Sequence, residues 1–160
     1  MKRLLTIAAI AALLIGCTAQ QPAPVVEDNT PGFVLSDENV EVKIGEDGAL
    51  LSLINKETGH NYASGEGLWR MFYNTHEEKE MQIDGTENTP EVSQEGDVII
   101  ITYKDLVHRG KALKMGLTLT VKVEDGAVRF GSEVSNNEPG TIIRELQYPL
   151  VGNMNLPEGH

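Results

Sequence analysis

The amino-acid sequence predicts an all-β protein, an antiparallel β-sandwich that begins at Phe33. Apolar and polar residues alternate over most of the chain after this point, most regularly from Met115 to Val123. Turn-forming residues recur at the short intervals that are typical of sandwiches. This region contains no long helical stripe, and about 125 residues are enough to enclose one hydrophobic core.

The individual strands follow from the same signals. The turn 45–48 separates two strands, and Glu124-Asp125-Gly126 predicts a hairpin turn. The continuous apolar run 98–101 is typical of a strand that is covered on both faces. Ile142, Arg144, Leu146 and Tyr148 are expected to share one face of the last strand. The predicted strands are 33–35, 40–44, 49–54, 97–103, 115–123, 128–134 and 142–148.

The N-terminal residues 1–16 predict an export signal. Lys2 and Arg3 give a short positive region, and an apolar run follows from residue 4 to residue 15. A helix needs roughly 20 apolar residues to span a bilayer, so this run is too short. The segment 14–17, Leu-Ile-Gly-Cys, resembles the lipobox of bacterial lipoproteins, which implies cleavage before Cys17 and lipid attachment to its sulfur. The alternatives are an ordinary secretory signal with a chance cysteine and a buried apolar helix.

Residues 17–32 predict a flexible tether, because proline, glutamine and small polar residues there cannot form a core. Aspartate after the cysteine would be typical of retention in the inner membrane. The residue at this position is Thr18, so we expect an outer-membrane anchor. The membrane, reached through the lipid on Cys17, is therefore one expected partner.

Cysteine content and charge restrict the function further. Cys17 is the only cysteine, so no disulfide within the chain and no thiolate metal site can form. The formal net charge is −11, and removal of the signal takes away Lys2 and Arg3 and leaves −13. This charge opposes a phosphate backbone and predicts no nucleic-acid partner. We interpret the acidic surface as solvation of an exported domain.

Three segments of the predicted sandwich resemble one known family. They are 48–62 (Gly-Ala-Leu-Leu-Ser-Leu-Ile-Asn-Lys-Glu-Thr-Gly-His-Asn-Tyr), 68–70 (Leu-Trp-Arg) and 144–150 (Arg-Glu-Leu-Gln-Tyr-Pro-Leu). They are similar to the galactose-mutarotase-like β-sandwich, a supersandwich at the N-terminus of many bacterial glycoside hydrolases. The resemblance spans residues 33–155 and consists of strands and turns, without a catalytic signature. It implies that a catalytic barrel domain lies C-terminal to this sandwich.

Trp69 and Arg70 are the candidate carbohydrate-binding residues. An aromatic ring can stack on the C–H face of a pyranose, although a lone tryptophan is more often part of the core. In a strand, Trp69 and Arg70 point to opposite faces, so if one is buried the other is exposed. Tyr73 and His108 could also contact a sugar, with an ordinary surface or core position as the alternative for each.

No recognisable catalytic constellation occurs in the sequence, so we predict no catalytic residue, no metal and no cofactor. The segment 76–80, His-Glu-Glu-Lys-Glu, lacks the second histidine of a zinc-protease helix. Paired carboxylates can hydrolyse glycosides, but 24 acidic residues create many pairs by chance. A mutarotase uses a histidine acid and a glutamate base, for which His60 or His108 with Glu145 is a conceivable set.

Three functions remain open. The first is the accessory, carbohydrate-associated sandwich of a lipid-anchored glycoside hydrolase, without activity of its own. The second is a free-standing, non-catalytic glycan-binding lipoprotein, and the third is a structural envelope lipoprotein with no sugar ligand. The segment 155–160, Asn-Leu-Pro-Glu-Gly-His, is not typical of a natural C-terminus. We therefore expect residues 33–160 to be an incomplete sandwich, with the barrel beyond His160.

Overall fold

The computed structural model confirms an all-β, antiparallel sandwich. It describes residues 31–63 and 67–152. The predicted export signal, Cys17, the tether up to residue 30 and the segment 155–160 lie outside the described residues. In the part that is described, no helix has the length and apolar character that are needed to cross a membrane.

Short strands joined by turns make up nearly all of the described chain, and all neighbouring strands pair antiparallel. The strands are β1 (Gly32–Ser36), β2 (Val40–Gly45), β3 (Leu50–Asn55), β4 (His60–Asn61), β5 (Arg70–Asn74), β6 (Met81–Asp84), β7 (Glu91–Glu95), β8 (Val98–Tyr103), β9 (Val107–His108), β10 (Lys111–Ala112), β11 (Met115–Glu124), β12 (Ala127–Asn136) and β13 (Ile142–Gln147). One short 3₁₀ helix, η1 (Gly85–Glu87), follows β6.

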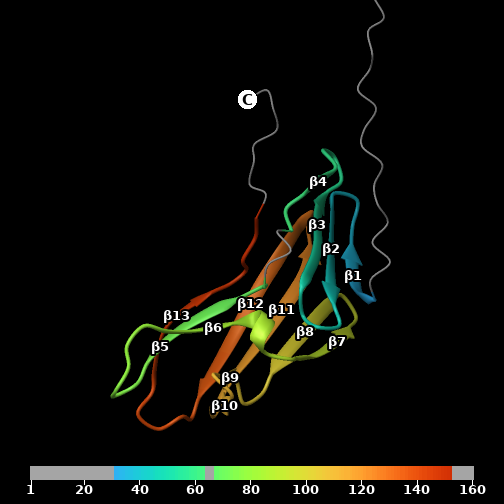
Figure 1. The fold of residues 1–160 in the computed structure, drawn as a ribbon. Helices are drawn as coiled ribbons and strands as arrows, with labels where there is room; N and C mark the ends of the chain where they lie inside the picture. Colours follow the sequence, from blue (N-terminus) through green and yellow to red (C-terminus); the bar gives the residue numbers. More distant parts are fainter. Residues whose placement is uncertain (1–30, 64–66, 153–160) are drawn as a thin grey trace, which may run out of the picture.

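Apart from the short β9–β10 hairpin, the strands lie in two layers (Figure 1). One layer is the sheet β12-β11-β8-β7, and the other contains the sheets β1-β2-β3-β4 and β13-β5-β6. Across the sandwich, β1 and β2 contact β8, β11 and β12. The Phe130 and Tyr148 rings meet edge to face at 5.6 Å, and the Tyr148 hydroxyl donates to the Thr120 carbonyl at 2.9 Å. These contacts hold both smaller sheets against the larger one.

The core lies between the layers and is built by period-two alternation. In β11, every second residue from Met115 to Val121 is buried and the residues between are half-buried. In β8, Ile99 and Ile101 are fully buried, whereas Val98 and Ile100 are half-buried on the outer side. The prediction that this strand is covered on both faces is therefore wrong. The reason is that no second layer of described strands lies over that side of the sheet (Figure 1).

The last strand differs from its prediction because it contains a β-bulge. Ile142 pairs with Asn74 on the outer side of its sheet and is 66% exposed. Leu146 pairs with Met71 and packs against the core. The pairing register shifts between residues 143 and 145, so Ile142 and Leu146 point to opposite faces. The expectation that they share one face is wrong for this reason.

One pair of turns connects the two layers. Asp125 and Gly126 both have positive φ, 54° and 75°, as a two-residue type I′ hairpin loop requires. Asp37, in the turn between β1 and β2, accepts hydrogen bonds from the backbone N–H groups of Asn39 (2.8 Å) and Val40 (2.9 Å). Its other carboxylate oxygen accepts the N–H of Gly126 at 3.0 Å. The Asp37 carboxylate therefore joins a turn of each layer.

Candidate functional site

Trp69 lies in the core. Its side chain is fully buried and packs edge to face against Tyr103, with the ring centroids 5.1 Å apart. A Cβ on Gly85 would lie 2.8 Å from the indole nitrogen, so a side chain at that position would displace the ring. Trp69 is thus a core residue, which was the alternative to carbohydrate binding, and its ring has no open face for a sugar.

Arg70 points to the outer side of the sheet, opposite to Trp69, as strand geometry predicts. Its Nε donates to Asp84 Oδ1 at 2.7 Å, and the Gln82 amide donates to Asp84 Oδ2 at 2.7 Å. Burial alone would raise the pKa of Asp84, but the hydrogen bonds from Arg70 and Gln82 and the Arg70 charge outweigh it and lower this pKa. Arg70 is therefore a cation held in place by an ionised partner.

Arg70 belongs to the outer face of the sheet β13-β5-β6, which we name the Phe72 face. Met71 and Tyr73 are buried in the core, so Arg70, Phe72 and Asn74 face outward. The strand register arranges the outward side chains in rows across the sheet. The rows are Ile142–Asn74, Glu145–Phe72–Gln82 and Gln147–Arg70–Asp84.

Phe72 differs from most other aromatic residues of the chain. The sequence contains three phenylalanines, four tyrosines and one tryptophan. All of them except Phe72 and Tyr62 belong to the core or pack against it. A hollow of about 390 Å³ lies at Phe72, and its lining is completed by Asn74, Glu80, Arg144, Glu145 and Gln147. The hollow thus combines one aromatic ring with a border of amide and charged groups.

The bulge in β13 brings Arg144 to this hollow. Ile143 pairs with Tyr73 and Glu145 pairs with Phe72, so Arg144 is an extra residue without a paired position on β5. In a regular strand, Arg144 and Glu145 would point to opposite faces, but here both line the hollow. Arg144 is exposed, and within the residues that the structure describes its guanidinium has no ion-pair or hydrogen-bond partner.

Two other polar side chains of the hollow each have one atom held by a hydrogen bond and another that is available to a ligand. The Gln147 amide donates to Glu145 Oε1 at 2.8 Å, so Glu145 Oε2 has no partner among the described residues. Asn74 Oδ1 accepts the backbone N–H of Glu80 at 2.8 Å, which orients the Asn74 amide with its NH₂ group open. Around Phe72 the hollow therefore offers donors from Asn74 and Arg144 and an acceptor from Glu145.

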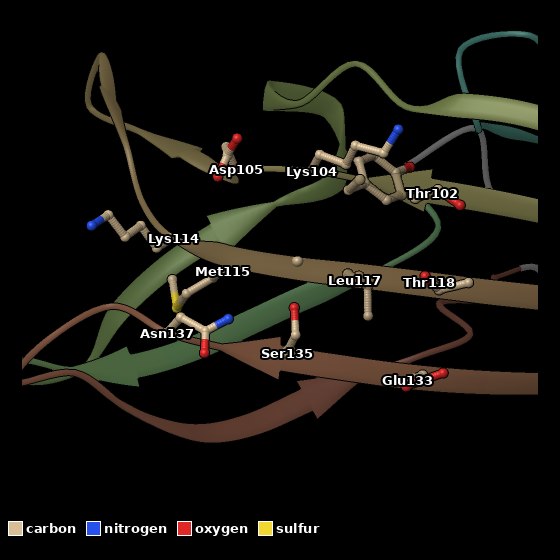
Figure 2. A pocket seen from close by; sticks show the side chains of 12 residues that line it. Thr102, Lys104, Asp105, Lys114, Met115, Leu117, Thr118, Glu133, Ser135 and Asn137 are labelled. Carbon is tan, nitrogen blue, oxygen red and sulfur yellow. The ribbon is translucent and has the colours of Figure 1, made fainter.

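The outer face of the other layer has a different chemistry. We name the outer side of β8, β11 and β12 the threonine face, because Thr118 pairs there with Thr102 on one side and with Glu133 on the other. A hollow of about 520 Å³ lies at one end of this face. Figure 2 shows its side chains, including Lys104, Asp105, Lys114, Ser135 and Asn137. Tyr103 also borders the hollow, but its side chain is buried in the core.

A third hollow, of about 500 Å³, opens between the β5–β6 turn, the β9–β10 hairpin and the β12–β13 loop. Tyr73 and His108, both considered as sugar contacts from the sequence, meet there edge to face with ring centroids 5.7 Å apart. Glu138 accepts the backbone N–H of Lys114 at 2.9 Å, and this bond, with Lys111 beside it, lowers the pKa of Glu138. A general acid needs a raised pKa, so Glu138 is poorly suited to donate a proton.

The histidine–glutamate set considered for a mutarotase is not assembled. His60 lies in β4 and is not among the residues that line the hollow of the Phe72 face, where Glu145 lies. Glu145 lines the hollow of the Phe72 face, whereas His108 lines the third hollow. Among residues 31–63 and 67–152, no group of three or more His, Cys, Asp or Glu side chains could hold a metal ion.

The chain matches no known family model and no curated protein. The structure adds two residues to the candidate site that sequence reasoning missed, Phe72 and Arg144. Phe72 could have been found, because it lies two residues after Arg70 and therefore shares its face in any strand. Arg144 could not, because the sequence of β13 gives no sign of the bulge.

Proposed function

We propose that this chain is the accessory, carbohydrate-associated β-sandwich of a lipid-anchored glycoside hydrolase, and that it binds glycan on the Phe72 face without hydrolysing it. The main support is the outward Phe72 in a hollow whose border carries open hydrogen-bond donors and an open acceptor. A single exposed apolar side chain would need no explanation. An aromatic ring combined with oriented polar groups is instead typical of a ligand site.

A pyranose has an apolar C–H face and polar hydroxyl groups, and both are complementary to the groups of this hollow. Its C–H face packs on the Phe72 ring, which removes apolar surface of both partners from water. Its hydroxyl groups can accept from Asn74 and Arg144 and donate to Glu145. Because Phe72 is carried by a paired strand rather than a loop, little conformational freedom is lost on binding.

Hydrolysis is not assigned to this chain. Glycoside cleavage needs a protonated carboxyl group and a second carboxylate on either side of the scissile bond. On the Phe72 face, both oxygens of Asp84 accept hydrogen bonds and its pKa is lowered, so it holds no proton to donate near neutral pH. The family resemblance supports a barrel domain after this sandwich as the place of the catalytic carboxylates. The lipobox-like segment supports anchoring through Cys17 in the outer membrane.

Glycan binding by the complete 160-residue chain tests the proposal. The protein is purified in a detergent without a sugar head group and screened against immobilised glucans, mannans, galactans, xylans and pectins. We expect Phe72→Ala to weaken binding about tenfold or more, because the stacking surface is lost. Thr118→Ala removes a comparable outward side chain from the threonine face, and we expect it to bind like the unaltered chain.

Several results would contradict this proposal. Glycan binding that Phe72→Ala leaves unchanged would remove the Phe72 face as the site. Absence of binding to every polysaccharide would favour the structural envelope lipoprotein. Glycoside turnover that a single Asp or Glu substitution in this chain abolishes would show an active site inside the sandwich.

A further inference from the structure

We infer that the Phe72 face selects neutral glycans with vicinal hydroxyl groups, and that Arg144 and Glu145 bind this diol. The inference rests on the proposed function, because it concerns the ligand of the same hollow. It starts from the bulge in β13, which places two sequence neighbours of opposite charge in one hollow beside Phe72.

The two side chains are complementary to a diol. The guanidinium of Arg144 presents several N–H donors in one plane, which suits two neighbouring oxygen atoms. Glu145 Oε2 is an acceptor without a partner in the described part of the chain. Each of two adjacent hydroxyl groups can accept from Arg144, and one can also donate to Glu145, so a diol satisfies both charged groups. A ligand with only donors or only acceptors would leave one of them unpaired.

The charge of the hollow favours a neutral sugar over an acidic one. Glu80 and Glu145 both line it, and Arg144 is the cation among its lining residues. Arg70, on the neighbouring row, is already neutralised by Asp84 at 2.7 Å. A uronate or sulfate group would therefore approach an excess of negative charge, in a chain whose formal net charge is −11.

The test uses three polysaccharides and matched variants of the complete chain. β-1,4-Galactan and β-1,4-mannan are neutral and carry vicinal 2,3-hydroxyl groups, which are trans in galactan and cis in mannan. The α-1,4-linked polygalacturonate carries the trans diol of galactan with a carboxylate on each ring. The site variants are Arg144→Ala, Arg144→Lys and Glu145→Gln. Arg129→Ala and Glu133→Gln remove the same charges from exposed positions on β12 and serve as controls.

We expect a neutral polymer to bind at least about tenfold more tightly than polygalacturonate. Arg144→Ala and Arg144→Lys should each weaken neutral binding about tenfold, since a lysine cannot present two coplanar donors. Glu145→Gln should weaken neutral binding and strengthen binding to polygalacturonate, because it removes a repelling charge. The two control variants should match the unaltered chain.

The outcomes separate this inference from the proposed function. Binding that depends on Phe72 but prefers polygalacturonate, or that ignores Arg144→Ala and Glu145→Gln, overturns the inference and leaves the function standing. The absence of Phe72-dependent binding to all three polymers overturns the inference, and its absence from the whole panel, glucans and xylans included, overturns the proposed function as well. Periodate cleaves the vicinal diol of mannan. Equal binding to intact and periodate-cleaved mannan would show that the diol is not the recognised group, and it would overturn this inference.

Discussion

The Phe72 face and the threonine face are the outer surfaces of two sheets in one sandwich, and they are built differently. On the threonine face, β11 and β12 pair in an unbroken register from Met115 to Glu124, and their outward positions carry glycine, threonine, serine and charged residues. On the Phe72 face, the register of β13 is interrupted at Arg144 and an aromatic residue faces outward. Both faces have hollows of similar size, about 390 and 520 Å³.

The size of the hollow therefore does not distinguish the two faces. The interrupted pairing register of β13 does. A regular strand sends neighbouring residues to opposite sides, so it cannot bring adjacent charges to one surface. The bulge removes this limit at Arg144 at the expense of one paired position. In this molecule the irregular strand β13 is the one that brings two sequence neighbours of opposite charge to a single hollow beside an aromatic ring.

The largest expected effect separates the inner and outer sides of β5. Met71→Ala should lower the free energy of unfolding by about 2–5 kcal/mol, because it leaves a cavity at a fully buried position. Phe72→Ala should cost only about 1 kcal/mol, because the ring is half-buried on the outer side. Urea denaturation of the two variants measures both values. A larger loss for Phe72→Ala than for Met71→Ala would make Phe72 a structural residue and end the contrast between the faces.

A smaller effect is expected from the carboxylate that holds Arg70. The pKa of Asp84 lies below its ordinary value, so its stabilising contribution is present above the unfolded-state pKa and is lost as pH falls through the folded-state pKa. Asp84→Asn should therefore flatten the loss of stability as pH falls below about 4. Because Arg70 is 36% exposed, solvent screening limits the effect to about 1 kcal/mol or less. Thermal melts across this pH range provide the measurement, and an unchanged acid transition in Asp84→Asn would show that the pair is not coupled to folding.

The smallest effect is expected on the threonine face. Thr118→Val keeps the shape of a half-buried, outward side chain and removes only its hydroxyl group. Its free energy of unfolding should stay within about 0.5 kcal/mol of the unaltered chain, and glycan binding should not change. Binding that falls in Thr118→Val but not in Phe72→Ala would reverse the assignment of the two faces.

The long, regular strands could be predicted from the sequence, because apolar and polar residues alternate in them without interruption. All of the predicted strands exist, including β11 with its alternation from Met115 to Val121. The short strands β4, β9 and β10 have two residues each, too few to show a period. In β5, Met71 and Tyr73 face the core while Phe72 faces outward, so three consecutive apolar or aromatic residues conceal the alternation. The outward Phe72 thus hid this strand from prediction.

The candidate site was predictable only in part. The expectation that Trp69 and Arg70 point to opposite sides depends on strand geometry alone, and it is confirmed. The outward position of Ile142 and the presence of Arg144 in the hollow depend on the bulge. A bulge is decided by how β13 fits against β5, a contact between distant parts of the chain, and the local sequence does not determine it.

The Asp37 carboxylate has a consequence for the order of folding. Its bond to Gly126 connects positions that are 89 residues apart, whereas its bonds to Asn39 and Val40 close only a local turn. Hairpins form within about 1–10 μs, but joining distant segments requires loop closure first. The Asp37 turn can therefore form early with one carboxylate oxygen unsatisfied by protein, and it acquires Gly126 only when the two layers meet. Non-local contacts of this kind are typical of sandwiches that fold in milliseconds to seconds.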